Sequence, residues 1–314
     1  EEAQIKKKKR RLVFKQYSLA VYNTNGKKES DIKLDANDRY VISGKLIEQP
    51  TGELLLAGFY SNAAKKQDLN GFYINKVDPV SGTLLLSSYK DINSGMLGKA
   101  YVDESDDDDM SKQEKKEAQK AKPTDDDDAD DFPNRFIIKS VDTNPVDNSI
   151  VITSEVSQYS YYTYTSSSYN NATRSWTYTT TYVHRFTNQD ILIINADKDG
   201  NIKWMNDLPK SQLEEVRTSN NHYGSGFYYD TDYSGYFANA GGMPYYSSYS
   251  SLINNNSLIL LVNDHTSNNV NPEYGNKVKT VYNFRKRSNL YGIAVDLTTG
   301  KMTRKIIASN SDET

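Results

Sequence analysis

Few residues in this chain have types and spacing suited to chemistry, and the clearest group is Asp197-Lys198-Asp199-Gly200. A calcium-binding loop of the EF-hand type begins with Asp and Asn ligands at alternate positions and ends in a Glu at position twelve. Position twelve counted from Asp197 is Leu208. Apolar-rich runs flank the group on both sides, so the pattern predicts a hairpin turn rather than a metal site.

Other candidates for catalysis or metal binding are equally sparse. The three histidines, at positions 184, 222 and 265, have no second histidine within five residues, so no metal-binding spacing occurs. There is no Cys, which excludes thiolate chemistry, Cys-ligated zinc and disulfides. A GxSxG elbow, a phosphate-binding loop and a dinucleotide-binding fingerprint are also absent. We therefore expect no metal and no cofactor.

Residues 157–186 suggest a different chemistry, that of molecular recognition. Tyr and Thr alternate on both sides of a polar centre, SSSYNNATRS, as in an extended β-hairpin. Exposed rings on such a hairpin give a protein or a glycan a large contact area at low entropic cost. The competing interpretation is that the tyrosines pack on neighbouring sheets. The residues that we expect to bind a partner are Tyr161, Tyr162, Tyr164, Tyr169, Trp176, Tyr178 and Tyr182.

The rest of the chain repeats one arrangement, an apolar strand, a short turn and a second strand. Gly supplies the positive φ that a tight hairpin turn requires. Four of the hairpins turn at Gly26, Gly82, Gly200 and Gly300. Hairpins of a second type lie between them and begin at Val41, Phe136 and Ser250. One hairpin of each type makes a four-stranded unit, which is the signature of a β-propeller blade.

The sequence thus predicts an all-β fold in which residues 1–314 form a single, partial β-propeller of about three and a half four-stranded blades. The opening hairpin lacks the first half of its blade. We expect the missing strands in further blades upstream or on a partner chain, because an open sheet edge invites aggregation. The chain begins with Glu1 and has no signal peptide, as expected for a processed or excised protein.

Three insertions lengthen the predicted blades. Residues 103–131 contain 14 acidic and 5 basic residues, a net charge of −9, and predict a solvated, disordered loop. A cation-binding tail is the alternative for this segment. The second insertion is the Tyr-rich hairpin, which we expect to project from one rim. The third, residues 220–251, is rich in Gly, Tyr, Ser and Asn and predicts an irregular loop.

Charge and hydropathy narrow the range of partners. The whole chain has a formal charge of −3, so the residues outside the acidic insertion sum to +6, which the run KKKKRR at 6–11 supplies. We interpret this run as a solvated linker. The near-neutral remainder argues against nucleic acid as a partner. No run of 18 apolar residues occurs, so we expect no transmembrane segment.

The segment DILIINADKDGNIKWMNDLPKSQ, residues 190–212, resembles a family of uncharacterised, exported β-propeller-like proteins of Bacteroidota. In that family a strand D-I-L-V-x-K leads to D-x-x-G-x-I-x-W and I-P-K-x-Q, and a Tyr- and Thr-rich hairpin precedes it. The later SSY at 247–249 and LILLVND at 258–264 also match. The resemblance covers residues 136–264, whereas the acidic insertion departs from it. It implies a protein exported to the periplasm, the outer membrane surface or the medium, and supplies no catalytic residues.

We therefore expect a non-catalytic scaffold or recognition module of the cell envelope that presents a Tyr-rich rim to a protein or glycan. One alternative is a subunit of an envelope complex that docks other chains through its open blade edge and insertions. The other is a glycan-processing hydrolase with a carboxylate pair, although Asp230, Asp232 and Asp264 resemble ordinary turn residues. An aromatic, uncharged rim favours binding, two buried carboxylates in a central channel favour the enzyme, and exposed apolar surface favours the complex.

Overall fold

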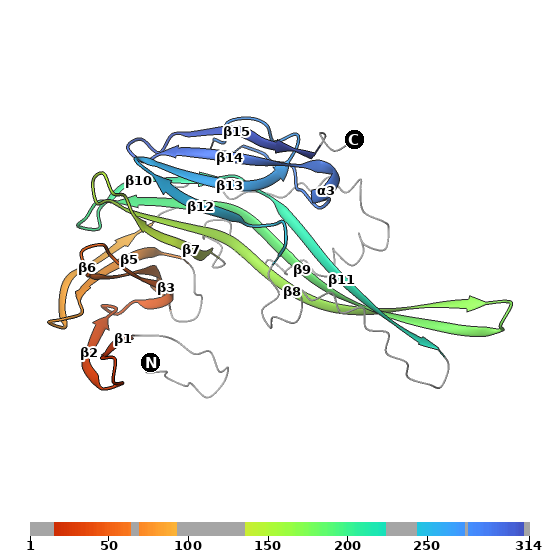
Figure 1. Cartoon of the computed structure of the whole chain (residues 1–314), viewed down its shortest axis with the longest axis horizontal. Helices are drawn as coiled ribbons and strands as arrows, with labels where there is room; N and C mark the ends of the chain where they lie inside the picture. Colours follow the sequence, from red (N-terminus) through yellow and green to blue (C-terminus); the bar gives the residue numbers. More distant parts are fainter. Residues whose placement is uncertain (1–15, 64–68, 93–135, 224–243, 274–275, 311–314) are drawn as a thin grey trace.

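The computed structural model describes residues 16–63, 69–92, 136–223, 244–273 and 276–310. Within these ranges the regular secondary structure is almost entirely β-strand, in four antiparallel sheets that follow one another along the sequence (Figure 1). The acidic insertion (103–131) and the basic run (6–11) lie outside the described residues. So do residues 224–243 of the third insertion, which include Asp230 and Asp232.

Apart from β11, the strands of each sheet are adjacent in the order in which they occur in the sequence. The first sheet is the hairpin β1 (Gln16–Tyr22) and β2 (Lys28–Asp35). The second contains β3 (Tyr40–Glu48), β4 (Leu54–Ser61), β5 (Gly71–Asp78) and β6 (Thr83–Asp91). The third contains β7 (Phe136–Thr143), β8 (Ile150–Asn170), β9 (Ser175–Ala196) and β10 (Ile202–Leu208), with β11 (Gln212–Tyr223) also paired to β9. The fourth contains β12 (Tyr249–Asn254), β13 (Ser257–His265), β14 (Ser288–Asp296) and β15 (Met302–Ser309), and the short helix α3 (Phe284–Arg287) precedes β14.

Each strand–turn–strand unit expected from the sequence forms an antiparallel hairpin. The four predicted turn glycines have φ between +69° and +80°, as hairpin turns of this kind require. At the turn that contains Asp197, the Asp197 carboxylate accepts hydrogen bonds from the backbone N–H groups of Asp199 (2.9 Å) and Asn201 (2.8 Å). These bonds, with one from the Asn201 side chain, help to lower the pKa of Asp197 even though burial opposes the shift. The Asp-x-Asp-Gly run is therefore engaged in closing its own turn.

The third sheet is the centre of the molecule because both of its faces are buried. Ile150 and Ile152 pack against the second sheet, whereas Val151 packs against the fourth. The same division holds on β9, where even and odd positions of the run 191–194 belong to different clusters. A strand covered on both sides has no polar face, which explains the unbroken apolar runs IVI and ILII. Each fully buried Ile or Val contributes roughly 1.5–3 kcal/mol through the hydrophobic effect.

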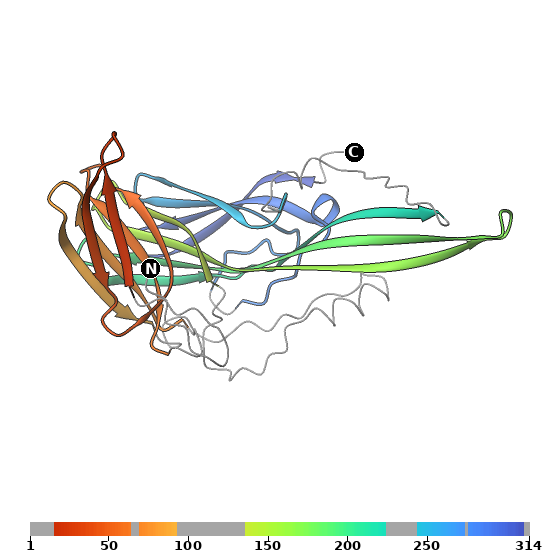
Figure 2. The same cartoon turned by 90° about the horizontal axis from the view of Figure 1, so that it is seen from below.

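The sheets stack face to face in chain order, so the molecule is layered (Figures 1 and 2). The β1–β2 hairpin places Ile32 and Leu34 against Val77 of the second sheet. Asp31, Lys33 and Asp35 alternate with these residues and are exposed, so the first layer has a polar outer face. The four sheets do not close into a ring or barrel within the described residues.

The strand β11 differs from the expectation for residues 220–251. We predicted an irregular loop beginning at residue 220, but β11 continues to Tyr223 and β12 already begins at Tyr249. The two asparagines of the polar run TSNN in β11 have little strand propensity of their own. Pairing with β9 from Asn188 to Thr177 supplies the hydrogen bonds that keep it extended.

Candidate functional site

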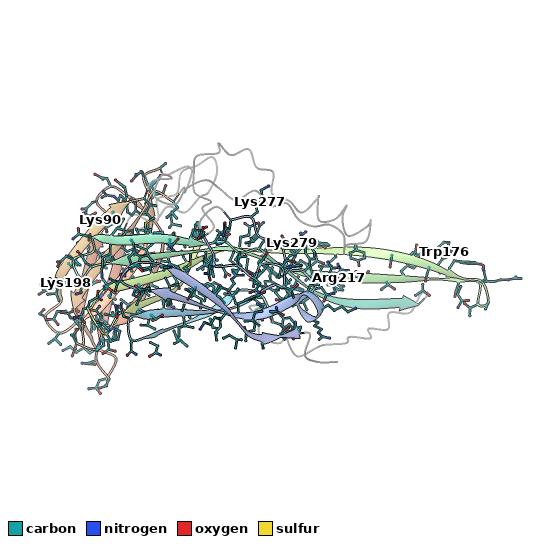
Figure 3. All side chains as sticks on the ribbon, turned by 90° about the horizontal axis from the view of Figure 1, so that it is seen from above. Lys90, Trp176, Lys198, Arg217, Lys277 and Lys279 are labelled. Carbon is teal, nitrogen blue, oxygen red and sulfur yellow. The ribbon has the colours of Figure 1, made fainter. Side chains whose placement is uncertain are left out.

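The Tyr-rich segment forms a three-stranded arm that continues from the third sheet. The strands β8 and β9 remain paired from Ile150↔Ala196 to Asn170↔Ser175, and β11 adds a third strand as far as Thr177. We call the part distal to Ser157 the arm. It extends well beyond the stacked sheets, with Trp176 close to its far end (Figures 2 and 3). The turn at residues 171–174 closes it, with Arg174 at a positive φ of 52°.

A β-bulge at the base of the arm decides which way its side chains point. Glu155 is opposite Ile191, but Ser157 is opposite Asn188, so β9 has one residue more than β8 between these pairs. Successive residues of a strand point to opposite faces, so an extra residue in β9 reverses the face of all its distal side chains. On β8 the odd-numbered residues stay on one face throughout. The β9 residues on that same face are odd-numbered in the stacked sheets and even-numbered in the arm.

The bulge brings the aromatic residues of β8 and β9 onto one face, which we call the aromatic face. The directly opposed pairs are Tyr159 with Phe186, Tyr161 with His184, Thr163 with Tyr182, Ser167 with Tyr178, and Tyr169 with Trp176. The register also places Thr165 and Thr180 on this face. None of these twelve β8 and β9 residues is Asp, Glu, Lys or Arg.

Ring contacts along the aromatic face hold its side chains in a row. The rings of Tyr169 and Trp176 are 5.1 Å apart at the tip. Near the base the His184 ring lies 4.9 Å from that of Tyr161, and its Nδ1 is 2.8 Å from the Tyr159 hydroxyl oxygen. Burial lowers the pKa of His184 below 6.5, so the imidazole is neutral at pH 7. The face therefore combines neutral rings with hydroxyl groups.

Five rings on this face remain about half exposed although each has a cross-strand neighbour. Cross-strand contact therefore leaves much of each ring accessible to a ligand. The exposed fractions are 54% for Tyr159, 50% for Tyr161, 46% for Tyr169, 52% for Trp176 and 48% for Tyr178.

The structure divides the seven residues expected to bind a partner between the two faces of the arm. Five of them, Tyr161, Tyr169, Trp176, Tyr178 and Tyr182, lie on the aromatic face, whereas Tyr162 and Tyr164 lie on the opposite one. Sequence reasoning did not single out Tyr159, His184 and Phe186, which belong to the aromatic face. A two-residue count back from Tyr161 would have found Tyr159. His184 and Phe186 follow Tyr182 on β9 at two-residue steps, so the same count would have found them.

On the opposite face, Tyr162 takes part in a cluster of charged residues. Its hydroxyl donates to Glu215 Oε1 at 3.3 Å, and Glu215 Oε2 accepts from Arg217 at 2.5 Å. Burial, followed by the negative charge of Glu215, raises the pKa of Tyr162 to about 12. Arg185 lies 3.9 Å from the same carboxylate. Tyr162 is thus engaged in a structural contact, unlike the exposed rings of the aromatic face.

Buried charges fix the junction where the arm leaves the stack. Lys210, between β10 and β11, donates to Glu155 Oε1 at 2.6 Å and to Gln212 Oε1 at 2.7 Å. Glu155 Oε2 accepts from the Ser248 hydroxyl at 2.6 Å and lies 3.2 Å from the ammonium of Lys139. Burial lowers the pKa of Lys210, and the adjacent Glu155 carboxylate opposes that shift.

The bulge and the fourth sheet are tied to the same junction. The backbone N–H of Lys210 donates to Asp190 Oδ1 in the bulge at 2.9 Å. Gln212 Nε2 donates to the carbonyl of Asn263 in β13 at 2.6 Å. Farther along β11, the Glu214 carboxylate accepts hydrogen bonds from the backbone N–H groups of residues 245–247 at 2.8–2.9 Å. The direction of the arm is therefore set by hydrogen bonds to charged groups.

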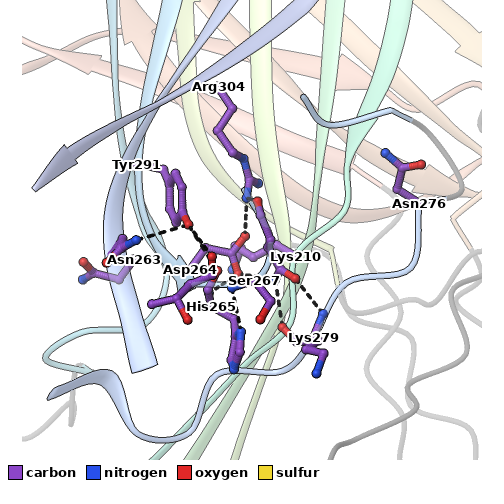
Figure 4. Close-up of polar contacts among 12 residues, drawn as sticks. Lys210, Asn263, Asp264, His265, Ser267, Asn276, Lys279, Tyr291 and Arg304 are labelled. Atoms are coloured by element: carbon purple, nitrogen blue, oxygen red, sulfur yellow. Dashed lines mark hydrogen bonds and ion pairs between the residues drawn. The ribbon is translucent and has the colours of Figure 1, made fainter. Parts of the chain in front are cut away.

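A second buried ion pair lies close to Lys210 (Figure 4). Arg304 donates to Asp264 Oδ2 at 2.9 Å, and its guanidinium lies 4.9 Å from the centre of the Tyr291 ring. The other oxygen of Asp264 accepts from the Asn268 amide and the His265 backbone N–H, both at 2.8 Å. Asp264, which the sequence suggested to be an ordinary turn residue, is a fully buried structural group.

The pKa of one carboxyl group is shifted in the direction that a catalytic acid needs. Burial, and then the negative charge of Asp190, raise the pKa of Asp207 well above 3.8.

Within the described ranges, no three His, Asp or Glu side chains are grouped as a metal site would require. In the same ranges no helix has the length and apolar character needed to cross a membrane.

Comparison with models of protein families, with curated proteins and with solved structures found no match to this chain.

Proposed function

We propose that this protein is a non-catalytic recognition module that presents the aromatic face of its arm to a protein or glycan. The observation that carries the proposal is the row of five half-exposed rings on one face of a projecting arm, where no β8 or β9 residue is charged. Exposed tyrosine and tryptophan rings offer a large contact area with little loss of side-chain entropy, and each combines an apolar ring with a polar group that can hydrogen-bond to a glycan or a protein. The neutral His184 adds no charge that would select for ionic ligands.

The remaining sheets act in this proposal as a scaffold that holds the arm. We infer that the second, third and fourth sheets are blades of a larger propeller and that the β1–β2 hairpin is half a blade. Their chain-order meanders and face-to-face stacking support this inference. We also propose that the protein is exported to the cell envelope. This part of the proposal rests only on the family resemblance of residues 136–264.

A role as a subunit of a larger assembly is the second candidate, because the fourth sheet has an apolar outer face. Ile259 and Leu261 alternate with buried residues of β13 and so point away from the third sheet. Leu252 and Ile307 are 49% and 59% exposed. A terminal layer of a stacked-sheet protein needs a polar outer face for solubility, as the β1–β2 hairpin has. The outer face of the fourth sheet suits contact with a further sheet.

The hydrolase alternative now rests on Asp207 and Asp190. A carboxylic acid of raised pKa beside a second carboxylate is the arrangement that glycosidases use. Glu155 and Asp264 are bound in buried ion pairs and are poorly suited to catalysis. Glycosidase assays of the natural chain and of Asp207→Asn test this alternative directly. Activity that disappears in the variant would replace the binding proposal.

Two assays test binding with the natural chain and two arm variants. Each protein is applied to glycan arrays, and each is immobilised to capture ligands from envelope extracts. Trp176→Ser with Tyr178→Ser removes two exposed rings from the aromatic face. The matched control, Tyr164→Ser, removes a ring from the opposite face of the same arm. We expect a ligand that the control retains and the double variant loses. Equal binding by all three proteins would refute the proposal, and the nature of the captured ligand distinguishes glycan from protein.

A further inference from the structure

The strand β8 forms one long edge of the arm. On its outer side β7 pairs with β8 only between Ile150 and Val156. From there to Asn170 no described strand lies on that side, while β9 covers the inner side without a break in register after Ser157. The segment Tyr159–Asn170 is therefore an unbroken edge of twelve residues, which at 3.3 Å per residue is roughly 40 Å long.

This edge has none of the features by which proteins prevent strands from pairing with other chains. Natural edge strands are usually short, bulged, or interrupted by Pro or by charged residues, especially Lys. Residues 159–170 contain only Tyr, Ser, Thr and Asn, and so include no Pro, Gly or charged residue. The strand β11 at the other edge has Glu214, Glu215 and Arg217. The difference singles out β8 as the edge suited to pairing.

We infer that β8 pairs with the β8 strand of a second copy of this chain, antiparallel and about a two-fold axis perpendicular to the sheet. A second copy offers an edge of the same length that also has no charge, so no like charges oppose one another. The arm extends away from the stacked sheets (Figures 1 and 2), so the two bodies lie at opposite ends of the paired arms. The main-chain hydrogen bonds of strand addition provide the affinity.

The symmetry has a consequence for the aromatic face. A two-fold axis perpendicular to the sheet keeps each residue on the same face in both copies. Directly opposed residues also share a face, so an odd-numbered residue of one copy is always opposite an odd-numbered residue of the other. Tyr159, Tyr161 and Tyr169 of one copy then lie on the same side as those of the other. Two three-stranded arms become one six-stranded sheet with a single, continuous aromatic face. The residue at the centre of the pairing is opposite its own counterpart.

The absence of Cys from the natural chain makes this arrangement directly testable. Cys is introduced singly at each position from 162 to 166, and the purified protein is oxidised without ligand. Directly opposed residues on antiparallel strands bring their Cβ atoms close enough for a disulfide. We expect a covalent dimer at one position, with yields that fall on either side of it. Ser175→Cys, at the exposed tip of the arm, is the control and should remain monomeric.

The second measurement is the oligomeric state by sedimentation. It compares the natural chain with a double variant that carries Thr163→Lys and Thr165→Lys. Both threonines are exposed on β8, so the lysines should leave the arm folded, which circular dichroism checks. We expect a dimeric natural chain and a monomeric variant, with Ser175→Lys dimeric as the control. A monomeric natural chain with no covalent dimer at any position from 162 to 166 would overturn the inference. Neither measurement uses a ligand, so failure here is separate from failure of the proposed function.

Discussion

Replacing Lys210 with Met should destabilise the protein far more than the same replacement at the surface. The side chains of Lys210 and Glu155 are 1% and 0% exposed, and the Nζ–Oε1 distance is 2.6 Å. Met fills a similar volume but leaves the Glu155 carboxylate buried without its closest cation. It also removes the hydrogen bond to Gln212.

The expected magnitude follows from what remains around Glu155. Removal of one partner from a buried ion pair costs about 3–5 kcal/mol. Glu155 keeps the hydroxyl of Ser248 at 2.6 Å and the ammonium of Lys139 at 3.2 Å, and Lys139 is partly exposed. These contacts compensate in part, so we expect a loss of about 3 kcal/mol in the free energy of unfolding, at the lower end of that range.

Urea unfolding followed by circular dichroism measures the loss, and hydrogen exchange shows where it acts. The amides of β11 should exchange faster in Lys210→Met, because Lys210 binds Gln212 at the start of that strand. The control is Lys198→Met. Its ion pair with Asp199 is highly exposed, at 69% and 61% for the two side chains, and such pairs add little stability.

A double-mutant cycle with Glu155→Gln completes the test. If the ion pair is the source of the loss, the double variant should be more stable than the sum of the single changes predicts. A loss below about 1 kcal/mol in Lys210→Met, or simple additivity of the two changes, would refute the account of the junction.

Three further predictions concern single positions. Asp207→Asn should raise the melting temperature at pH 7 but not at pH 3.5. The pKa of Asp207 is raised in the folded protein, so the contribution of this carboxyl group to stability is present below pH 3.8 and is lost as the pH rises through the folded-state pKa. Gly58→Ala should lower the free energy of unfolding by about 3 kcal/mol, since its Cβ would meet the Ser43 carbonyl oxygen at 2.0 Å; Gly26→Ala, at φ +76° with open space around it, should cost only about 1 kcal/mol. Glu214→Gln should cost about 1–2 kcal/mol in urea unfolding, because an amide oxygen cannot replace a carboxylate that accepts three backbone N–H groups.

The sequence alone determined the local parts of this protein. Each hairpin could be predicted because its two strands and its turn are contiguous, and glycine marks the turns where φ is positive. The Tyr and Thr alternation in residues 157–186 was sufficient to predict a long hairpin, since strand propensity and period-two patterning agree there.

Tertiary structure decided which of those residues share a face and which charges are buried. The register of β8 and β9 places Trp176, Tyr178 and Tyr182 on the side of Tyr161 and Tyr169, and no local pattern marks the bulge at the base of the arm. The strand β11 is extended only because β9 pairs with it.

The buried charges show the same limit. Glu155 and Lys210 are 55 positions apart and would be taken for surface charges in the sequence. They form an ion pair because the arm, the bulge and the fourth sheet meet at one point. Side-chain direction and burial depend on partners distant in the chain, and for that physical reason only the folded structure could reveal the aromatic face and its support.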